Sequence, residues 1–244
     1  HQLTRPQLME GEATHRVIRI AELAEVPVYI VHLSAKEALD AVVEARDRGI
    51  SAFAETCPHY LTHDVTWERG TVGKINPPLR EKEDCDALWQ AIIDGHVDTI
   101  ASDHVHRTIA GKDGGIWKAS PGCPGLETIL PVMLTEGHHK RGVPLSRIVS
   151  MLCEVPAKSM GLWGRKGAIR PGFDADIAIL DLDAEYEVTQ DSLLSDAGYS
   201  IYEGWTMRGK VTDTLVRGRA VFRDGVIVEG SDGHGRYQRR SLSA

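Results

Sequence analysis

The chain has 244 residues, of which 42% are hydrophobic and 26% charged, and this composition suits a folded protein with a sizeable core. A formal net charge of −7 at pH 7 disfavours a nucleic-acid surface, so we expect no nucleic-acid partner. No apolar run approaches the roughly 20 residues that cross a bilayer, so we expect no membrane partner either.

The chain begins at His1 rather than at a methionine and enters a patterned helix almost at once. We therefore expect the sequence to be the C-terminal portion of a longer polypeptide. The four cysteines lack C-x-x-C spacing, which favours reduced thiols, and hence a cytoplasmic location, over a disulfide framework or a zinc ribbon.

The first part of the chain alternates predicted helices with predicted strands. Residues 8–24 form a helix whose apolar face includes Leu8 and Ile20, with Glu10 on its outer face. Residues 28–33 are almost continuously apolar, which is typical of a strand buried on both faces of a parallel sheet. Further helices are predicted at 35–47 and 83–94, and further strands at 50–55 and 97–102. This alternation indicates right-handed βαβ units and a parallel sheet.

The composition of the chain changes at Gly164. Before it, the Gly-rich loop 111–125 is long for a strand-to-helix connection, which favours a lid or a binding loop. Two helices are predicted on that side, at 126–141 and 145–160. After Gly164, short strands are predicted at 175–181, 211–217, 220–223 and 225–229, with hairpin turns at Arg217-Gly218 and Asp224-Gly225. We therefore expect a small antiparallel β unit after this point.

Two polar residues that follow buried strands are the first candidates for a site. His32 stands near the end of strand 28–33, and Asp103 follows strand 97–102. The carboxyl ends of parallel strands meet at one edge of a sheet, so we expect both side chains to face one cavity. An imidazole and a carboxylate together suit a divalent metal such as zinc, but a catalytic zinc site normally takes three protein ligands. Either the other ligands lie outside this chain, or the site is not metallic.

Several motifs occur in a recognisable order. They are HQLTRP (1–6), VHLS (31–34), ETCPHY (55–60), NPPLR (76–80), ASDH (101–104), PGCPGLE (121–127) and KGAIRPGFDAD (166–176). Taken together, they resemble the cyclic amidohydrolases, the family that includes D-hydantoinase, dihydropyrimidinase, allantoinase and dihydroorotase. The motifs extend over nearly the whole chain, and the hydantoinase/dihydropyrimidinase branch is the most similar.

The resemblance implies a fold of the α/β class. The chain would form the C-terminal part of a (β/α)8 metal-dependent hydrolase barrel, followed by part of a small β-sandwich domain. We accordingly expect residues 1–164 to belong to the barrel, 165–230 to the sandwich and 231–244 to a mobile tail. The resemblance also implies two divalent metal ions, usually zinc, and a homotetramer for the full-length protein.

The resemblance assigns roles to residues of the matching motifs. His32 would ligate one metal, and Asp103 would ligate the other and shuttle the proton of the reaction. Asn76, Ser120 and Pro121 would contact the cyclic amide, partly through backbone groups. From the residues alone, we expect His59 and His104 to lie behind the ligands or at the substrate, and His63 and His106 to lie at exposed loop positions.

The family also uses a His-x-His pair, a bridging carboxylated lysine and another histidine, all ahead of the segment that begins at His1. We therefore expect this chain alone to bind no binuclear metal centre and to be inactive, whereas the intact enzyme would hydrolyse cyclic amides. Dihydroorotase and allantoinase are alternatives within the class. A non-catalytic scaffold, like the dihydropyrimidinase-related proteins of neurons, is the alternative from another class, and the presence of His32 and Asp103 favours the enzyme.

Overall fold

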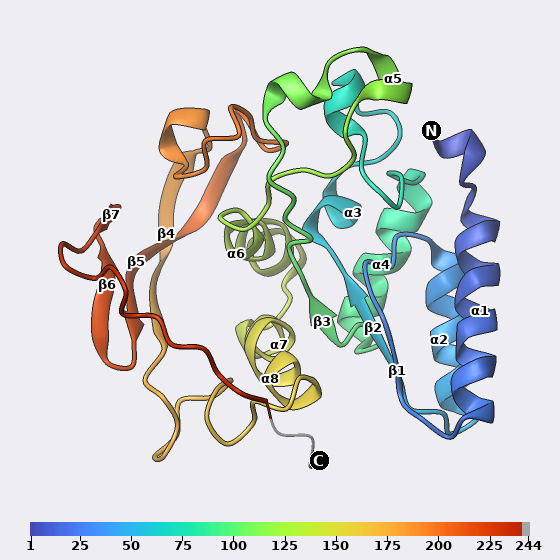
Figure 1. Cartoon of the computed structure of the whole chain (residues 1–244), viewed down its shortest axis with the longest axis horizontal. Coiled ribbons are helices and arrows are strands. Elements are labelled where there is room, and N and C mark those ends of the chain that lie inside the picture. The colour runs from blue at the N-terminus through green and yellow to red at the C-terminus, as the bar shows by residue number, and fades with distance from the viewer. Residues whose placement is uncertain (241–244) are drawn as a thin grey trace. The chain divides into compact units, whose positions relative to one another are not determined.

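The computed structural model describes residues 1–240, and the chain divides into two compact units (Figure 1). The first unit comprises His1–Leu130 and Val188–Trp205, and the second comprises Pro131–Glu187 and the chain from Thr206 onward. The predicted change of domain at residues 164–165 falls inside the second unit, so the division into barrel and sandwich portions stays a prediction. Residues 231–240 contain no helix or strand, and the last four residues of the predicted tail lie outside the described residues.

The first unit contains a three-stranded parallel sheet in the order β1-β2-β3, which confirms the predicted βαβ pattern. Its strands are β1 (Val28–Ile30), β2 (Ala52–Thr56) and β3 (Thr99–Ile100). Its helices are α1 (Gln7–Leu23), α2 (Lys36–Asp47), α3 (Pro58–Thr62), α4 (Lys82–Asp94) and α5 (Gly115–Lys118). Short 3₁₀ turns lie at Gln2–Thr4, Gly70–Gly73, Ile109–Lys112 and Gln190–Ser192.

One face of this sheet packs against α2 and α1 and forms the hydrophobic core. The core side chains are small or branched, which lets the helix and the sheet approach closely. The buried members are Ile18, Leu33, Ala38, Ala41, Val42, Ala45, Ala52 and Ala54. The opposite face carries larger and more polar side chains: Tyr29 stacks on Phe53 with ring centroids 6.1 Å apart, and the Tyr29 hydroxyl hydrogen-bonds Glu55 and Thr99.

Two burial predictions for this region are wrong. Strand β1 is only partly buried along its whole length, because it lies at the edge of the described sheet with β2 as its single neighbour there. Helix α1 buries small residues, such as Gly11, against α2, while Leu8 and Ile20 are 73% and 60% exposed. A Cβ added at Gly11 would lie 2.8 Å from Cβ of Glu37, so close packing of the two helices selects the small side chain.

The amino end of β3 is fixed by an ion pair between Arg46 and Asp98. The guanidinium also donates to the carbonyl oxygens of Ala52 and His96, at 2.8 and 2.7 Å. The Asp98 carboxylate accepts in addition from the backbone N–H of Ala54, at 2.6 Å. These bonds join α2, β2 and β3 at the edge of the sheet opposite to the predicted site.

Two helical stretches follow, of which the first begins at the end of the first unit and the second lies in the second unit, and both differ from prediction. The stretch predicted at 126–141 is α6 (Ile129–Val132) followed by a π-helical segment, Met133–His139. The stretch predicted at 145–160 is α7 (Leu145–Val149), a π-helical segment Ser150–Glu154, and α8 (Val155–Ser159). Pro131 and Pro156 stand beside these π segments and have no N–H to donate to the preceding turn, which disfavours an uninterrupted α-helix.

An antiparallel sheet of order β4-β5-β6-β7 completes the second unit, as the sequence predicts. Its strands are β4 (Ile177–Glu187), β5 (Thr206–Val216), β6 (Arg219–Arg223) and β7 (Val226–Ile227). Both predicted hairpin turns are confirmed, because Arg217-Gly218 and Asp224-Gly225 all have positive φ angles. Consecutive positive φ angles suit the twist of a two-residue hairpin.

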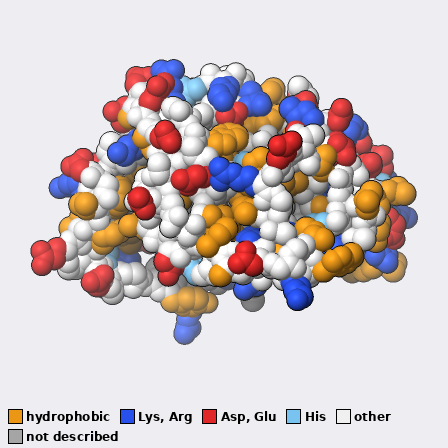
Figure 2. Space-filling view, turned by 90° about the horizontal axis from the view of Figure 1, so that it is seen from above, with side chains coloured by type: hydrophobic (Ala, Val, Ile, Leu, Met, Phe, Trp, Pro, Cys, Tyr) orange, Lys and Arg blue, Asp and Glu red, His pale blue; other side chains and the backbone are white. Residues whose placement is uncertain are grey.

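The described surface carries no candidate membrane span and shows mixed charges. Within residues 1–240, no helix combines the length and the apolar composition needed to cross a bilayer. Figure 2 shows acidic, basic and hydrophobic side chains interspersed over one face of the molecule. The net charge is therefore not gathered into a single area on that face.

The first prediction concerns Gly209, which lies in β5 with a φ of +101°. A Cβ there would lie 2.8 Å from Cδ1 of the buried Leu134, whereas Gly225, with a φ of +88°, has nothing within 4 Å. We expect Gly209→Ala to lower the free energy of unfolding by about 1–3 kcal/mol more than Gly225→Ala, since only the former adds a clash to the backbone strain. Urea denaturation of both variants tests this, and equal losses would contradict it.

Candidate active site

The two predicted ligands lie at the same edge of the parallel sheet. His32 follows the end of β1 by two residues, and Asp103 follows the end of β3 by three. Because β1 and β3 both flank β2 and run parallel to it, their carboxyl ends meet at one edge, as predicted. The metal-binding roles of the two residues stay a prediction.

Both residues have an unusual backbone conformation. The φ angle is +43° at His32 and +44° at Asp103, in the left-handed region that favours glycine. The other three such non-glycine residues among the described ones lie in turns: Glu25 after α1, and Arg217 and Asp224 in hairpins. Such a conformation costs about 1–3 kcal/mol and persists only where the surroundings fix it. It ends each strand and redirects the chain at the position of the candidate ligand.

The residue after His32 is fixed by two hydrogen bonds to β2. The N–H of Leu33 donates to the carbonyl oxygen of Glu55 at 2.7 Å, and the Thr56 hydroxyl donates to the carbonyl oxygen of Leu33 at 2.6 Å. The Glu55 carboxylate accepts more weakly from the N–H of His32, at 3.4 Å. The predicted strand 28–33 therefore ends early, at Ile30, because these bonds hold His32 out of the extended conformation.

Ser34 is bound by a buried ion pair between Glu10 and Arg80. The Glu10 carboxylate accepts from the N–H of Ser34 at 2.8 Å and from Nη2 of Arg80 at 2.7 Å. It also accepts from the Ser34 hydroxyl, which in turn accepts from Nε of Arg80 at 2.9 Å. The two side chains are only 14% and 3% exposed. The prediction that Glu10 lies on the outer face of its helix is therefore wrong.

The same groups supply the cap that α2 lacks. Its first flanking residue, Ala35, has no side chain that can accept a hydrogen bond, so the helix cannot cap itself. Instead, Glu10 from α1 accepts from the N–H of Ala35 at 3.2 Å, and Asp84 from α4 accepts from the N–H of Lys36 at 2.8 Å. Acidic groups are favourable at a helix N-terminus, and here they also join three helices beside the candidate ligand.

The Asp103 carboxylate is half-buried and lies among buried groups of the first unit. Burial raises its pKa, and the nearby His32 imidazole lowers the pKa in part. Asp103 in turn contributes to the raised pKa values of the Cys57 and Cys123 thiols, for which burial is the main cause. The Asp103 carboxylate is therefore coupled electrostatically to His32, Cys57 and Cys123.

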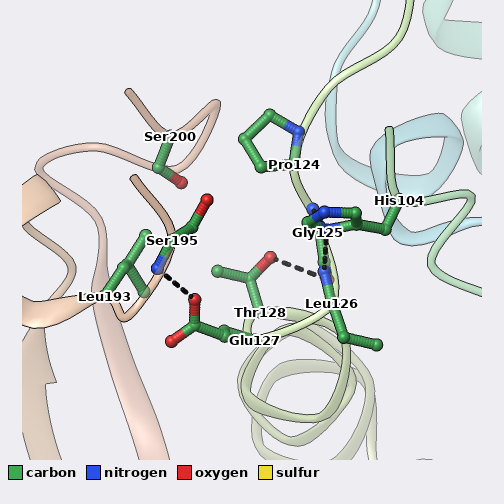
Figure 3. Close-up of a pocket in the computed structure, with 9 residues that line it drawn as sticks. All are labelled: His104, Pro124, Gly125, Leu126, Glu127, Thr128, Leu193, Ser195 and Ser200. Carbon is green, nitrogen blue, oxygen red and sulfur yellow. Dashed lines mark hydrogen bonds between the residues drawn. The ribbon is translucent and has the colours of Figure 1, made fainter. Parts of the chain in front are cut away.

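His104 fixes the turn at the end of the Gly-rich loop. Its Nδ1 accepts from the N–H groups of Gly125 and Leu126, both at 3.2 Å, which assigns the proton of the neutral ring to Nε2 (Figure 3). Gly125 is required here, since a Cβ would lie 3.1 Å from the carbonyl oxygen of Ser102. The imidazole therefore joins the chain that follows Asp103 to the turn at Gly125.

A small pocket beside this turn is lined by residues of the same unit (Figure 3). The Glu127 carboxylate accepts from the N–H groups of Leu194 and Ser195, at 2.8 and 3.0 Å. The Thr128 hydroxyl donates to the carbonyl oxygen of Gly125 at 3.3 Å. Glu127 thus attaches the segment that follows β4 to the predicted binding loop.

His59 is almost fully buried and has an unused ring nitrogen. It is 2% exposed, and its Nε2 has no hydrogen-bond partner among the described residues. Burial lowers the pKa of His59 to about 3, with smaller contributions from His63 and His32, so the ring is neutral at neutral pH. Its ring edge packs on Tyr60, whose hydroxyl donates to the carbonyl oxygen of Pro77 at 2.9 Å. This supports a place behind the predicted site, and its role stays a prediction.

His63 is not at an exposed loop position, and that prediction is wrong. It is 3% exposed, and its ring packs against Trp67, Tyr202 and Trp205 with centroid distances of 4.6 to 5.3 Å. The aromatic partners from the distant segment 188–205 bury it. His106 is exposed as predicted, and it pairs with Asp196 at 2.6 Å.

The predicted substrate residues lie on two loops that the backbone joins. Asn76 is exposed, and Ser120 and Pro121 are partly buried. The N–H of Gly122 donates to the carbonyl oxygen of Lys74 at 3.0 Å, so the two loops are directly connected. The structure therefore brings the two segments together, while their contact with a substrate stays a prediction.

The donor chemistry of His32 and Asp103 suits a divalent metal, but the described chain does not complete a set of ligands. Within residues 1–240, no group of three or more His, Cys, Asp or Glu side chains is arranged to hold a metal ion. A pair of ligands is the most that the two residues supply, and a catalytic zinc normally takes three from protein.

Sequence reasoning missed the residues that hold this site in place. They are Glu10, Arg80, Lys112, which donates to the carbonyl of Gly122, and Glu127. Arg80 and Glu127 belong to the motifs NPPLR and PGCPGLE, so their importance could have been predicted from the sequence. Glu10 and Lys112 have no local pattern that distinguishes them from solvated charges.

Comparison with known proteins gives a consistent result. The amidohydrolase family model matches residues 20–221. The D-hydantoinase of Ralstonia pickettii is 37% identical over 251 aligned positions, which cover 98% of this chain and 54% of that protein. The allantoinase of Rubrobacter xylanophilus is 37% identical over 235 positions, which cover 94% and 51%. The chain thus spans about half the length of the curated relatives it matches.

A solved structure gives the same match in three dimensions. The dihydropyrimidinase from Brevibacillus agri superposes with a TM-score of 0.95 at 34% sequence identity, over 100% of this chain and 55% of that one. This similarity confirms the predicted fold, the C-terminal part of a (β/α)8 hydrolase barrel followed by part of a small β-sandwich.

The second prediction tests the buried ion pair. Glu10→Ala leaves the Arg80 guanidinium buried without a counter-charge and removes one of the two carboxylates that cap α2, so we expect it to lower the free energy of unfolding by about 3–5 kcal/mol. Glu12→Ala is the matched control, because Glu12 pairs with Arg16 at the surface of the same helix. The control should cost about 0.5 kcal/mol or less. Denaturant unfolding measures both, and similar losses would contradict the assigned role of Glu10.

The third prediction concerns pH. The pKa of His59 is lowered to about 3 in the folded chain, whereas the same side chain has its ordinary pKa of 6.5 in the unfolded chain. Below pH 6.5 the unfolded chain therefore binds a proton at His59 more readily than the folded chain does. Stability from this residue is therefore present at neutral pH and is lost as the pH falls, by about 2 kcal/mol between pH 7 and pH 5. We expect His59→Gln to flatten the stability profile over that range. Parallel slopes for the two proteins in urea titrations would refute the assignment.

Proposed function

The chain belongs to the amidohydrolase family, and on that premise we propose that it carries one side of an active site that hydrolyses cyclic amides. The reaction would open hydantoins or dihydropyrimidines, the activities named in its relatives D-hydantoinase and dihydropyrimidinase. Because the chain spans about half the length of these relatives, the activity of the whole protein is part of the proposal.

One observation carries this proposal. His32 and Asp103 occupy corresponding places after parallel strands, and both adopt the left-handed backbone conformation that is rare for their residue types. Backbone strain of this kind concentrates at functional sites, where the surrounding structure fixes it. If these positions only ended the strands, glycine or a residue in the extended conformation would do so without strain. The backbone strain at both His32 and Asp103 therefore supports a function for both side chains.

The family is generally metal-dependent, and we propose two divalent ions, with zinc as the preferred metal. His32 would hold one ion and Asp103 the other, with the remaining ligands supplied from outside the described residues. When bound, such ions polarise the scissile carbonyl and activate water. Asp103 would accept the proton released in the attack and deliver it to the ring nitrogen that leaves. The raised pKa of Asp103 supports this role, because partial burial makes the carboxylate a better base.

The substrate ring would lie against two connected loops. We propose that Asn76, Ser120 and Pro121 contact the cyclic amide, in part through backbone groups. The hydrogen bond from the N–H of Gly122 to the carbonyl oxygen of Lys74 supports a joint role for the two loops. His104 would act indirectly, since its Nδ1 already accepts two backbone N–H groups of the turn.

Allantoin is the second candidate substrate. The allantoinase of Rubrobacter xylanophilus and the D-hydantoinase of Ralstonia pickettii are equally identical to this chain, at 37%. Identity alone therefore does not separate the two substrates. A panel of hydantoin, 5,6-dihydrouracil, allantoin and dihydroorotate separates them by their relative kcat/KM values.

Cellular location and assembly complete the proposal. The four cysteines are free thiols, and three of them are buried, which supports a reducing compartment such as the cytoplasm. Helix α1 exposes Leu8, Ile20 and Leu23 at 60 to 88%, and exposed apolar side chains favour association. We propose a homotetramer for the full-length protein on the strength of the family resemblance.

The fourth prediction tests Asp103. In a chimera where this chain replaces the matching part of the Ralstonia pickettii D-hydantoinase, we expect hydantoin hydrolysis with two equivalents of bound zinc. Asp103→Ala should lower kcat/KM by several orders of magnitude, because it removes a ligand and the proton carrier together. Asp113→Ala, at an exposed position of the Gly-rich loop, is the control and should leave turnover nearly unchanged.

Three outcomes separate the possibilities. Near-normal turnover by the Asp103→Ala chimera, with metal saturating, would sink the assignment of this residue. A folded, metal-loaded chimera that opens none of the four substrates would favour the non-catalytic alternative. The 244-residue chain alone is expected to show neither two bound zinc ions nor turnover above background.

A further inference from the structure

Lys112 is a fully buried lysine inside the Gly-rich loop. Its side chain is 1% exposed, although lysine is almost never buried without a partner. Its Nζ donates to the carbonyl oxygens of Lys74 and Ser120, both at 3.1 Å, and to that of Gly122. The ammonium also lies 5.9 Å from the centre of the Tyr199 ring. Three carbonyl groups and an aromatic face thus surround one charge.

This arrangement specifies the protonated form of the side chain. An ammonium has three N–H donors and no acceptor, and here three acceptors face it. A neutral amine would leave one carbonyl without its donor and would bring a lone pair toward the oxygens. The geometry therefore favours the charge, even though burial lowers the pKa of Lys112 from its usual value.

The charge has no acidic partner in the described chain. Among residues 1–240, the Lys112 ammonium bonds carbonyl oxygens and forms no ion pair. Besides burial, the cations Lys74 and Arg107 lower its pKa, and Cys123 acts to raise it. A buried charge held only by carbonyl dipoles is costly, so a structural role alone would be better served by an apolar residue. The location of the three carbonyls indicates why a charged residue stands here.

The three carbonyls belong to the two predicted substrate loops. Lys74 stands two residues before Asn76, while Ser120 and Gly122 flank Pro121. A trans peptide group points its N–H away from its C=O, so the Lys74 and Gly122 carbonyls that turn toward Lys112 turn the N–H groups of Ile75 and Cys123 away from it. The Ser120 carbonyl is followed by Pro121, which has no N–H. The ammonium therefore sets the direction of the backbone groups on both loops at once.

We propose that Lys112 is a positioning residue that holds the Asn76 loop and the Ser120–Gly122 loop in the arrangement that receives the cyclic amide. The part of this inference that concerns substrate rests on the proposed function. The part that concerns the loops rests on the hydrogen bonds alone. Lys112 would act through the backbone groups that it orients, without touching the substrate itself.

The fifth prediction tests the loops by amide hydrogen exchange on the 244-residue chain, which needs neither metal nor substrate. Lys112→Met keeps the unbranched side chain up to the position of Cε and removes the ammonium with its donors. We expect exchange at the hydrogen-bonded amides of Lys74, Ser120 and Gly122 to become about tenfold faster or more, with exchange in α2 unchanged. Lys118→Met, at an exposed position of the same loop, is the matched control and should change neither.

Two rescue experiments distinguish the charge from simple packing. Lys112→Arg keeps several N–H donors and should restore most of the lost protection. Lys112→Ala removes three carbons and the ammonium, so n-propylammonium ions should restore protection in this variant, while tetramethylammonium, which has no N–H donor, should not. If Lys112→Met fails to fold, the arginine and alanine variants carry the test.

The inference would be overturned by native exchange rates at both loops in Lys112→Met, or by equal rescue with the two ammonium ions. Loss of the whole fold in all three variants would also overturn it, because the role would then be global. Failure of hydrolysis in the chimera, with the expected exchange results, would refute the proposed function and leave the role of Lys112 in the loops intact.

Discussion

The buried ion pair between Glu10 and Arg80 is the contact on which the geometry of the candidate site most depends. It joins α1 to the loop that carries Asn76, and through Ser34 it fixes the chain just after His32. Such a pair gains little net free energy, because both charges lose their hydration, but it is expensive to break once buried. Its effect is therefore to specify one arrangement of three chain segments. That specificity is what a strained residue such as His32 requires, since the strain persists only if its neighbours cannot relax.

Strand β3 shows how the same residue type serves opposite purposes at its two ends. Asp98, before the strand, is paired with Arg46 and accepts a backbone hydrogen bond, so its charge is fully compensated. Asp103, after the strand, has no side-chain hydrogen bond or ion pair among residues 1–240 and has a raised pKa. An acid whose charge is compensated contributes stability, whereas an uncompensated and half-buried acid is available to a ligand or a proton. The division agrees with the general location of chemistry at the carboxyl edge of parallel sheets.

The sequence was sufficient for the order of elements and for the placement of the candidate ligands, because both depend on short-range patterns. Apolar strands followed by His32 and Asp103, and turns such as Arg217-Gly218, are visible in a few consecutive residues. Burial by distant segments was not predictable in this way. His63 is buried by aromatic side chains more than a hundred residues away, and Glu10 by Arg80, so both appear in the sequence as ordinary exposed residues. The same limitation applies to β1, whose burial depends on which strands lie beside it.

Lys112 and Asp103 together suggest why the Gly-rich loop can be ordered without a regular secondary structure. Both charges act on Cys123: Lys112 lowers the pKa of its thiol and Asp103 raises it, and burial raises it more than either charge changes it. On one side, the ammonium fixes the carbonyl of Gly122; on the other, the N–H of Val105 donates to the carbonyl of Cys123 at 3.0 Å. Backbone groups of this short segment are thus directed alternately inward and toward the chain that follows Asp103. In a loop ordered by such polar contacts, hydrophobic burial contributes little to the conformation, so single charged side chains determine its shape. This is the reason to expect that a change at Lys112 alters the site more than a change of similar size in the sheet.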